Sequence, residues 1–327
     1  MHVSALEWFV TVGVTVAVLL FDVVIIGRRP HVPSRRETAV ALAVYVGLAT
    51  AFGLWVWFFH GAQYGLEFFA GWLTEYSLSV DNLFIFLVIM ASFNVPRIYQ
   101  QEALLVGIIL ALVFRAVFIA AGAVAIERFS PVFYLFGAFL VYTAVMLFRD
   151  TDHDDDADNA VVRFARRRLR TTDRWDGLRM VVRENGTRVL TPMFLVVVAL
   201  GTTDLLFALD SIPAIYGLTQ QAYLVFTANV FALMGLRQLY FLLGGLLRRL
   251  VYLSQGLGVI LAFIGVKLIL LALRNNEVPF INGGEPVPVP QISTPVSLAV
   301  IVVVLAVTTA ASLYKTRVRD RRPLDSA

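Results

Sequence analysis

Thr74-Glu-Tyr-Ser-Leu-Ser-Val-Asp-Asn82 places two acids, Glu75 and Asp81, inside a long apolar run. The run, residues 66–93, is long enough to cross the roughly 30 Å hydrocarbon core of a bilayer as a helix. A carboxylate at that depth costs about 2.5–3.5 kcal/mol. Each acid must therefore be paired, protonated or bound to a cation.

A second stretch, residues 203–211, repeats this pattern as Thr-Asp-Leu-Leu-Phe-Ala-Leu-Asp-Ser. Each copy has a threonine, an acid, five further residues, an aspartate and a small polar residue. The acids of the second copy are Asp204 and Asp210, and they too lie in an apolar run. Because charged residues are rare at membrane depth, the duplication indicates a function rather than chance.

The composition predicts an all-α polytopic membrane protein that forms a single transmembrane domain. Of 327 residues, 59% are hydrophobic, and the mean hydropathy is +0.77. The absence of cysteine excludes disulfides and thiolate metal sites, and none of the four histidines lies deep in an apolar run. A metal site in the membrane would therefore be built from oxygen ligands.

Nine apolar runs predict about nine spans, with boundaries good to a few residues. We expect them at residues 7–27, 37–58, 66–93, 102–126, 131–148, 191–213, 221–246, 255–273 and 296–314. Most Lys and Arg residues then fall on one face, which predicts an outside N-terminus and a cytoplasmic C-terminus in the cell inner (plasma) membrane. The first run has no basic leader and no cleavage site, so we expect an uncleaved span.

Three segments between and after the spans are expected outside the bilayer. Residues 149–190 form a charged cytoplasmic loop, residues 274–295 an external loop, and residues 315–327 a basic cytoplasmic tail. The first loop begins with the acidic cluster Asp150–Asp158. A solvated loop with a short interfacial helix explains it better than a cation-collecting antechamber, because its spacing matches no EF-hand.

The third to fifth and the sixth to eighth spans resemble an inverted repeat, at residues 66–148 and 191–273. The two acidic motifs lie on helices of opposite direction, and Arg115 in the fourth span corresponds to Arg237 in the seventh. Such a 3+3 architecture places a substrate site near the midplane, at the repeat interface.

Helical geometry divides the polar residues of each motif between two faces. One face of the first motif holds Glu75, Ser79 and Asn82, and another, roughly 120° round, holds Thr74, Ser77 and Asp81. In the second motif, Asp204 and Ser211 share a face, with Thr203 and Asp210 on the other side. Asp81 follows Glu75 by six positions, a rise of about 9 Å. An ion should therefore bind between the third and sixth spans and not on either alone.

Carboxylate, amide and hydroxyl oxygens suit a hard divalent cation such as Mn²⁺, Mg²⁺ or Ca²⁺. Four carboxylates around one such ion leave two negative charges. Arg115, Arg237 and Lys267 could balance or couple to that charge, and so could protons. The simpler alternative is that the acids only form salt bridges with these three cations and hold the helices together.

The sequence resembles the TerC/Alx family of integral membrane proteins. The resemblance rests on the two acidic motifs, continued through Leu83-Phe84 and Ile212-Pro-Ala-Ile215, and on Phe263-Ile-Gly-Val-Lys-Leu-Ile-Leu270. It implies a place in the wider LysE-like exporter superfamily, and a role in manganese efflux, metal homeostasis and tellurium resistance. We expect any tellurite effect to be indirect, because four carboxylates would repel an oxyanion. The resemblance assigns the metal or proton sites to Glu75, Asp81, Asp204 and Asp210, with Asn82 and Ser211 as supporting ligands. We expect the neighbouring hydroxyls of Thr74, Thr203 and Ser79 to support the site as well.

These observations predict a transporter rather than an enzyme. The expected function is export of Mn²⁺ as substrate, with proton exchange as an option and no tightly bound cofactor. The expected partners are the lipid bilayer, the metal ion and protons, and not nucleic acid; the oligomeric state stays open. The alternatives are an exporter of amino acids or small organic cations, and a non-transporting membrane factor for metalation of other proteins. An intramembrane aspartyl protease is disfavoured, because neither motif contains Gly-x-Gly-Asp.

Overall fold

The structure is a computed structural model, and it describes most of the chain. The described residues are 1, 3–28, 33–128, 131–149, 172, 175–177, 179–184, 187–243 and 251–320; for residues 19, 22–28, 81, 84, 127, 128, 243 and 317–320 only the backbone is described. The acidic cluster Asp150–Asp158 lies outside these residues, as does the end of the predicted tail.

Nine long helices make up the described part of the chain, and they confirm the all-α polytopic fold. They are α1 (Ala5–Arg28), α2 (Arg35–His60), α3 (Ala62–Ser92), α4 (Arg97–Arg128), α5 (Val132–Arg149), α7 (Pro192–Tyr216), α8 (Ala222–Leu243), α9 (Leu253–Arg274) and α10 (Thr294–Asp320). Eight of them, α2 to α10, are long and apolar enough to cross a membrane. In α1 the corresponding stretch, Ala5–Val18, is shorter, so the first of the nine expected spans stays a prediction.

Polar side chains cap the N-termini of two helices, α2 and α7. The side chain of Ser34 accepts from the backbone N–H of Glu37, whose own side chain accepts in return from the Ser34 backbone. This capping box satisfies amide groups that the first turn of α2 leaves unpaired. At the start of α7 the side chain of Thr191 accepts from the backbone N–H of Phe194, and Pro192 follows Thr191 at the first helical position, where proline needs no hydrogen-bond partner.

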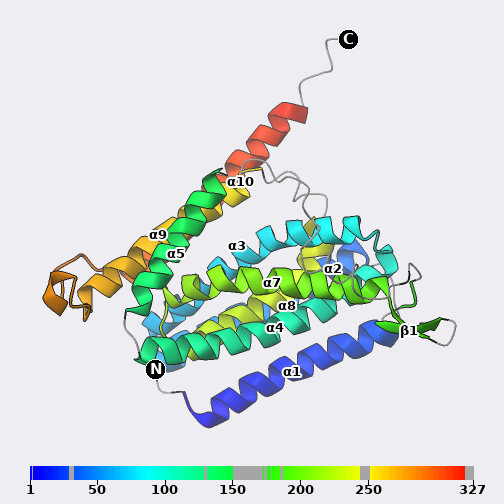
Figure 1. Cartoon of the computed structure of the whole chain (residues 1–327), viewed down its shortest axis with the longest axis horizontal. Helices are drawn as coiled ribbons and strands as arrows, with labels where there is room; N and C mark the ends of the chain where they lie inside the picture. The colour runs from blue at the N-terminus through cyan, green and yellow to red at the C-terminus, as the bar shows by residue number, and fades with distance from the viewer. Residues whose placement is uncertain are drawn as a thin grey trace.

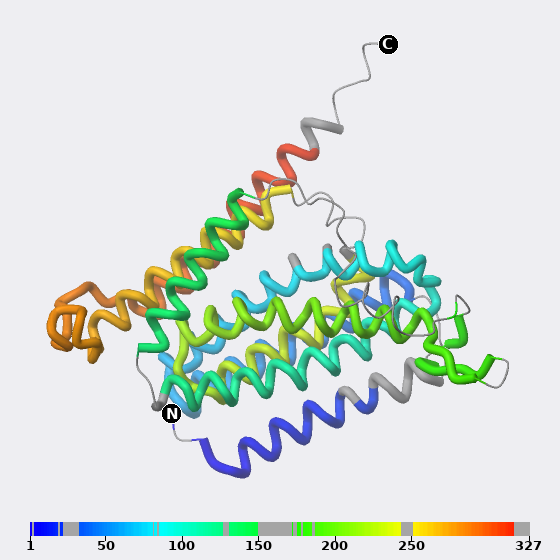
Figure 2. Tube along the Cα trace, in the orientation of Figure 1, coloured from blue at the N-terminus to red at the C-terminus, as the bar shows by residue number. Residues whose placement is uncertain are grey.

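The helices form two groups (Figure 1). In the larger group, α3 packs against α2, α7 and α8, while α4 packs against α7 and α8. In the smaller group, α5, α9 and α10 run together and lean away from the first (Figure 2), and α10 also contacts α3. The pairs α3–α8 and α4–α7 are those that an inverted repeat would require; the repeat itself stays a prediction.

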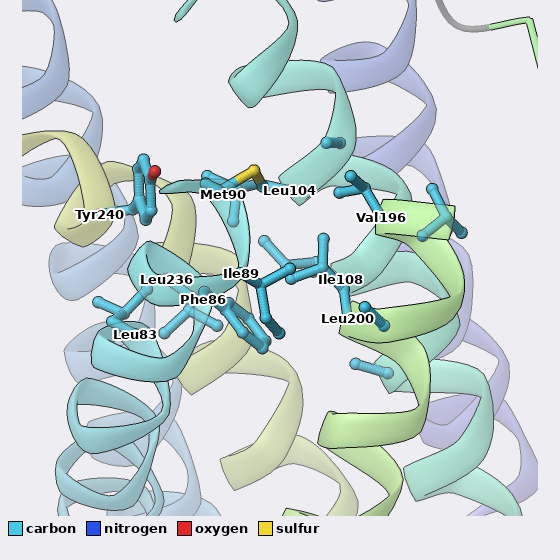
Figure 3. Close-up of a cluster of buried hydrophobic side chains, with 14 of the residues drawn as sticks. Leu83, Phe86, Ile89, Met90, Leu104, Ile108, Val196, Leu200, Leu236 and Tyr240 are labelled. Atoms are coloured by element: carbon cyan, nitrogen blue, oxygen red, sulfur yellow. The ribbon is translucent and has the colours of Figure 1, made fainter. Parts of the chain in front are cut away.

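The largest apolar core fills the space between α3, α4, α7 and α8 (Figure 3). Phe86 and Ile89 of α3 meet Ile108 of α4 and Leu200 of α7 there, and all four side chains are at most 3% exposed. In lipid, such close packing replaces the hydrophobic effect as the force that holds helices together. The core therefore fixes α3 and α7, the helices of the two acidic motifs, relative to each other.

Two glycines let α5 and α9 cross in backbone contact. A Cβ at Gly137 of α5 would lie 2.8 Å from the carbonyl oxygen of Gly265, and a Cβ at Gly265 would lie 2.9 Å from that of Gly137. Real Cβ atoms do not approach backbone so closely. Small residues at such a crossing let membrane helices pack tightly.

We expect Gly265→Ala to destabilise the folded protein by about 1–3 kcal/mol, because the added methyl group must push two helix backbones apart. The melting temperature of the purified protein in detergent would measure this. Gly47→Ala in α2 is the matched control, since nothing lies within 4 Å of a Cβ there. That change should be neutral or stabilising by up to about 1 kcal/mol. Equal melting temperatures for the two variants would contradict the close crossing.

The connections differ from expectation at two places. The predicted charged loop contains an antiparallel hairpin, β1 (Val181–Glu184) paired with β2 (Thr187–Leu190), with Glu184 opposite Thr187. The sequence between the strands, Asn185-Gly186, is a strong two-residue hairpin signal that the expectation of a loop with a helix missed. Secondly, α10 continues to Asp320, six residues into the predicted tail, whereas the predicted loop 274–295 agrees with the ends of α9 and α10.

Candidate functional site

The side chain of Arg115, in the middle of α4, joins the two acidic motifs. Its Nη1 forms an ion pair with Glu75 of α3. Its Nη2 lies 3.2 Å from Oδ1 of Asp204 on α7, and its Nε lies 3.4 Å from Oδ2 of the same carboxylate. The first acid of each motif is therefore held by one guanidinium between two facing helices.

Two neutral side chains complete the shell around this guanidinium. Nη1 of Arg115 donates to Ser211 Oγ at 3.1 Å and to Asn229 Oδ1 at 2.8 Å. The amide of Asn229, on α8, donates to the carbonyl of Val225 at 3.0 Å, which turns its oxygen toward Arg115. Four helices thus contribute to the cluster of Glu75, Arg115, Asp204, Ser211 and Asn229, which we call the arginine cluster.

The arginine cluster is almost completely closed to solvent. Arg115 and Asp204 are each 1% exposed, and Glu75 is 0% exposed. With all three groups ionised, two carboxylates against one guanidinium leave one negative charge. Buried charges are tolerated only when paired and hydrogen-bonded, so this excess charge favours a proton or a further cation.

Three oxygens on one stretch of α3 are buried without a hydrogen-bond partner among the described residues. They are Oε2 of Glu75, Oγ1 of Thr74 and Oγ of Ser79. Glu75 and Ser79 lie one helical turn apart on the same face of α3. Buried polar atoms are normally satisfied, and all three side chains are predicted ligands. These oxygens could serve a bound ion or water.

The structure also locates the other predicted residues of the two motifs. Asp210 is half-buried on α7, whereas Asn82 and Thr203 are buried, at 7% and 9% exposure. Asp81 lies within α3, but its side chain is outside the described part. Among the described side chains, no three Asp, Glu or His residues gather closely enough to hold a metal ion.

The three predicted balancing cations have different surroundings. Arg115 is in the arginine cluster. Arg237 is buried on α8, eight residues beyond Asn229, which corresponds to a rise of about 12 Å. Lys267 of α9 donates to Ser297 of α10 at 3.0 Å. The described contacts of Arg115 reach the acids, whereas the described hydrogen bond of Lys267 leads to α10.

Sequence reasoning missed Asn229. It is an amide in the apolar run of α8, and it is 1% exposed. The signal was present, because a polar side chain at such depth needs a partner, but the sequence does not say which helix supplies it.

A comparison with models of known protein families gives a match over most of the chain. The model of the integral membrane protein TerC family matches residues 60–320, which include both motifs. The chain belongs to the TerC family. No solved structure matches this TerC-family chain.

Its relatives within the TerC family include proteins from three bacteria. An uncharacterised membrane protein of Mycobacterium tuberculosis H37Rv is 50% identical over 332 residues, covering 100% of this chain and 84% of the relative. A Myxococcus xanthus membrane protein is 37% identical, covering 95% and 92%. Alx of Escherichia coli K12, named a membrane-bound redox modulator, is 38% identical, covering 79% and 84%. These relatives support a multi-pass membrane protein; the inner membrane stays a prediction.

Proposed function

We propose that this TerC-family protein exports a hard divalent cation, Mn²⁺ being the leading candidate, through the arginine cluster between α3 and α7. The observation that carries the proposal is Oε2 of Glu75. It belongs to a fully buried carboxylate and has no hydrogen-bond partner among the described residues. A buried carboxylate oxygen without such a partner is available to coordinate a cation.

The chemistry of the surrounding atoms supports a hard cation. Ser79 and Thr74 add hydroxyl oxygens without partners, and Asp204 adds a second carboxylate within reach of the same guanidinium. Carboxylate and hydroxyl oxygens are preferred by Mn²⁺, Mg²⁺ and Ca²⁺ over softer metals. The likeness to the TerC/Alx family favours Mn²⁺ among the three, and favours export.

Arg115 has a defined role in this proposal. Without a substrate ion it neutralises one of the two carboxylates and keeps them facing each other. A divalent ion entering the cluster would compete with the guanidinium for those carboxylates. Together with Arg115, the ion would bring three positive charges against the two negative charges of Glu75 and Asp204. One of the second acids of the motifs, Asp81 or Asp210, is therefore needed for balance, and the other is available to take up a proton. Protons taken up by these acids would release the ion.

We expect Asp210→Asn to reduce Mn²⁺ transport at least tenfold, because Asp210 is one of the two acids proposed to balance the ion or to take up the proton that releases it. The measurement is Mn²⁺ flux into proteoliposomes containing the purified protein, wild type beside the variant. Asp81→Asn is tested in parallel, because it removes the matching acid of the first motif. Both variants should also fail to restore manganese tolerance to cells.

The control is Glu285→Gln, which changes an exposed acid in the loop before α10 and should leave flux within about twofold of wild type. Wild-type flux in both the Asp81 and Asp210 variants would overturn the proposal. Absence of flux in the wild type, with manganese tolerance retained in cells, would instead favour a non-transporting membrane factor.

A further inference from the structure

A second polar site lies away from the arginine cluster. A cavity of about 720 Å³ opens where α3 begins and where α7 and α9 end. Its wall is formed by the first turns of α3, the segment 217–221 after α7, one face of α9 and the segment 291–295, which leads into the first turn of α10. With the predicted topology, this is the outer face of the protein.

Glu67 gives the cavity a fixed negative charge. The side chain is 7% exposed. Its Oε1 accepts from Gln63 Nε2 at 3.0 Å, and its Oε2 accepts from Thr219 Oγ1 at 2.7 Å. Both partners also line the cavity, so they hold the carboxylate in one orientation at its wall. A carboxylate has lone pairs for further donors beyond these two.

Lys267 gives the same cavity a positive charge. Its Nζ donates to Ser297 Oγ at 3.0 Å, and Ser297, which is 0% exposed, donates in turn to the carbonyl of Ser293. This chain anchors the ammonium to α10 and leaves two of its three N–H donors available. In the part of the chain that the structure describes, no ion pair of 4.0 Å or less joins Lys267 to Glu67. The two opposite charges are therefore held apart in one cavity.

The charge pattern distinguishes between ligand classes. A lone divalent cation is disfavoured, because the cavity offers one carboxylate whose oxygens already accept hydrogen bonds, and an ammonium that repels it. The volume is in the range of small-molecule sites, about 300–1,000 Å³. Amide side chains of Gln220, Gln221 and Gln291 add neutral donors and acceptors. A molecule with an ammonium at one end and a carboxylate at the other matches all of these features.

We propose that this cavity binds a small zwitterion of the amino-acid type, with its ammonium at Glu67 and its carboxylate at Lys267. The site is separate from the arginine cluster. Glu67 and Glu75 are eight residues apart on α3, a rise of about 12 Å, and Lys267 has no described contact with the acids of the cluster. Binding here does not depend on the proposed cation transport.

The test uses the full-length protein purified in detergent and the shift of its melting temperature. The probes are the twenty common amino acids, tested singly, and for each one that binds, its methyl ester and its N-acetyl derivative. The ester removes the carboxylate charge and the N-acetyl group removes the ammonium charge. We expect at least one amino acid to bind and both of its derivatives to bind at least tenfold more weakly.

Two variants test which charged residue binds which end of the ligand. Glu67→Gln keeps the side-chain shape and should remove the preference for the free amino acid over its N-acetyl derivative. Lys267→Gln should remove the preference over the methyl ester. Glu285→Gln and Lys315→Gln, both at exposed positions, serve as controls and should keep both preferences.

The inference would be overturned if no amino acid binds the wild type, or if the derivatives bind as tightly as the parent. These wild-type measurements decide it even where a variant fails to fold. Retained preferences in both cavity variants would also overturn it. Measuring Mn²⁺ flux on the same preparations separates the two sites, since loss of zwitterion binding says nothing against flux, and absent flux says nothing against binding.

Discussion

Arg115→Met is expected to lower the free energy of unfolding by about 3–5 kcal/mol, the usual cost of removing one partner from a buried ion pair. The change would leave Glu75 and Asp204 facing each other without a counter-charge, at 0% and 1% exposure. It would also leave the oxygen of Asn229 without its described donor. Tryptophan fluorescence during thermal unfolding in detergent would measure the loss.

A compensating variant tests the cause. Arg115→Met combined with Glu75→Gln and Asp204→Asn removes all three charges, and we expect it to recover most of the lost stability, because neutral groups of similar shape replace the ion triad. The matched control is Arg179→Met, at a side chain that is 75% exposed and paired only with Asp176 in the described contacts. It should change stability by less than about 1 kcal/mol. An equal effect at both arginines would contradict the electrostatic explanation.

Glu75→Gln is expected to reduce Mn²⁺ flux at least 100-fold without lowering stability. The amide has nearly the same shape as the carboxylate, and the remaining pair of Arg115 and Asp204 is electrically balanced. The variant therefore removes both the carboxylate oxygen that is available to the ion and the excess negative charge of the arginine cluster. Flux in proteoliposomes and the melting temperature of the same preparation are the two measurements.

These two measurements distinguish between two interpretations of the arginine cluster, as a structural ion pair and as a substrate site. If the acids only hold the helices together, losing one should lower the melting temperature, and flux should fall only as the folded protein is lost. If the acids bind the substrate, flux should fall while the melting temperature is kept. Glu285→Gln again provides the control at an exposed acid. Wild-type flux in Glu75→Gln would refute a role for this carboxylate in transport.

Hydropathy and charge were sufficient to predict the positions of the spanning helices and to single out the buried acids. Eight of the nine expected spans coincide with long apolar helices to within a few residues, because a bilayer imposes a minimum length on each apolar run. Glu75 and Asp204 could be singled out because a charge at such depth is costly. That the two first acids lie on facing helices also followed from the expected repeat.

Arg115 was one of three expected partners of the acids, but the sequence could not say which of the three reaches Glu75 and Asp204. Arg115 and Arg237 have similar apolar surroundings in the sequence, yet the packing of α4 between α7 and α8 brings the first of them to both acids. Lys267 was expected to balance the same acids, but its described hydrogen bond is to Ser297 of α10, and it lines a separate cavity. Sequence spacing fixes which residues share a helix face, whereas the distance between faces of different helices depends on the tertiary packing.

The place of the arginine cluster within the helices has an electrical consequence. Glu75 and Asp204 lie near the midpoints of α3 and α7, so an ion bound there would have crossed about half of the transmembrane voltage. For a divalent ion this equals moving about one elementary charge through the whole potential, or about 2.3 kcal/mol per 100 mV. Loading of the cluster from one side of the membrane and release to the other would therefore respond in the same direction to a change in voltage, because both steps move positive charge the same way across the membrane.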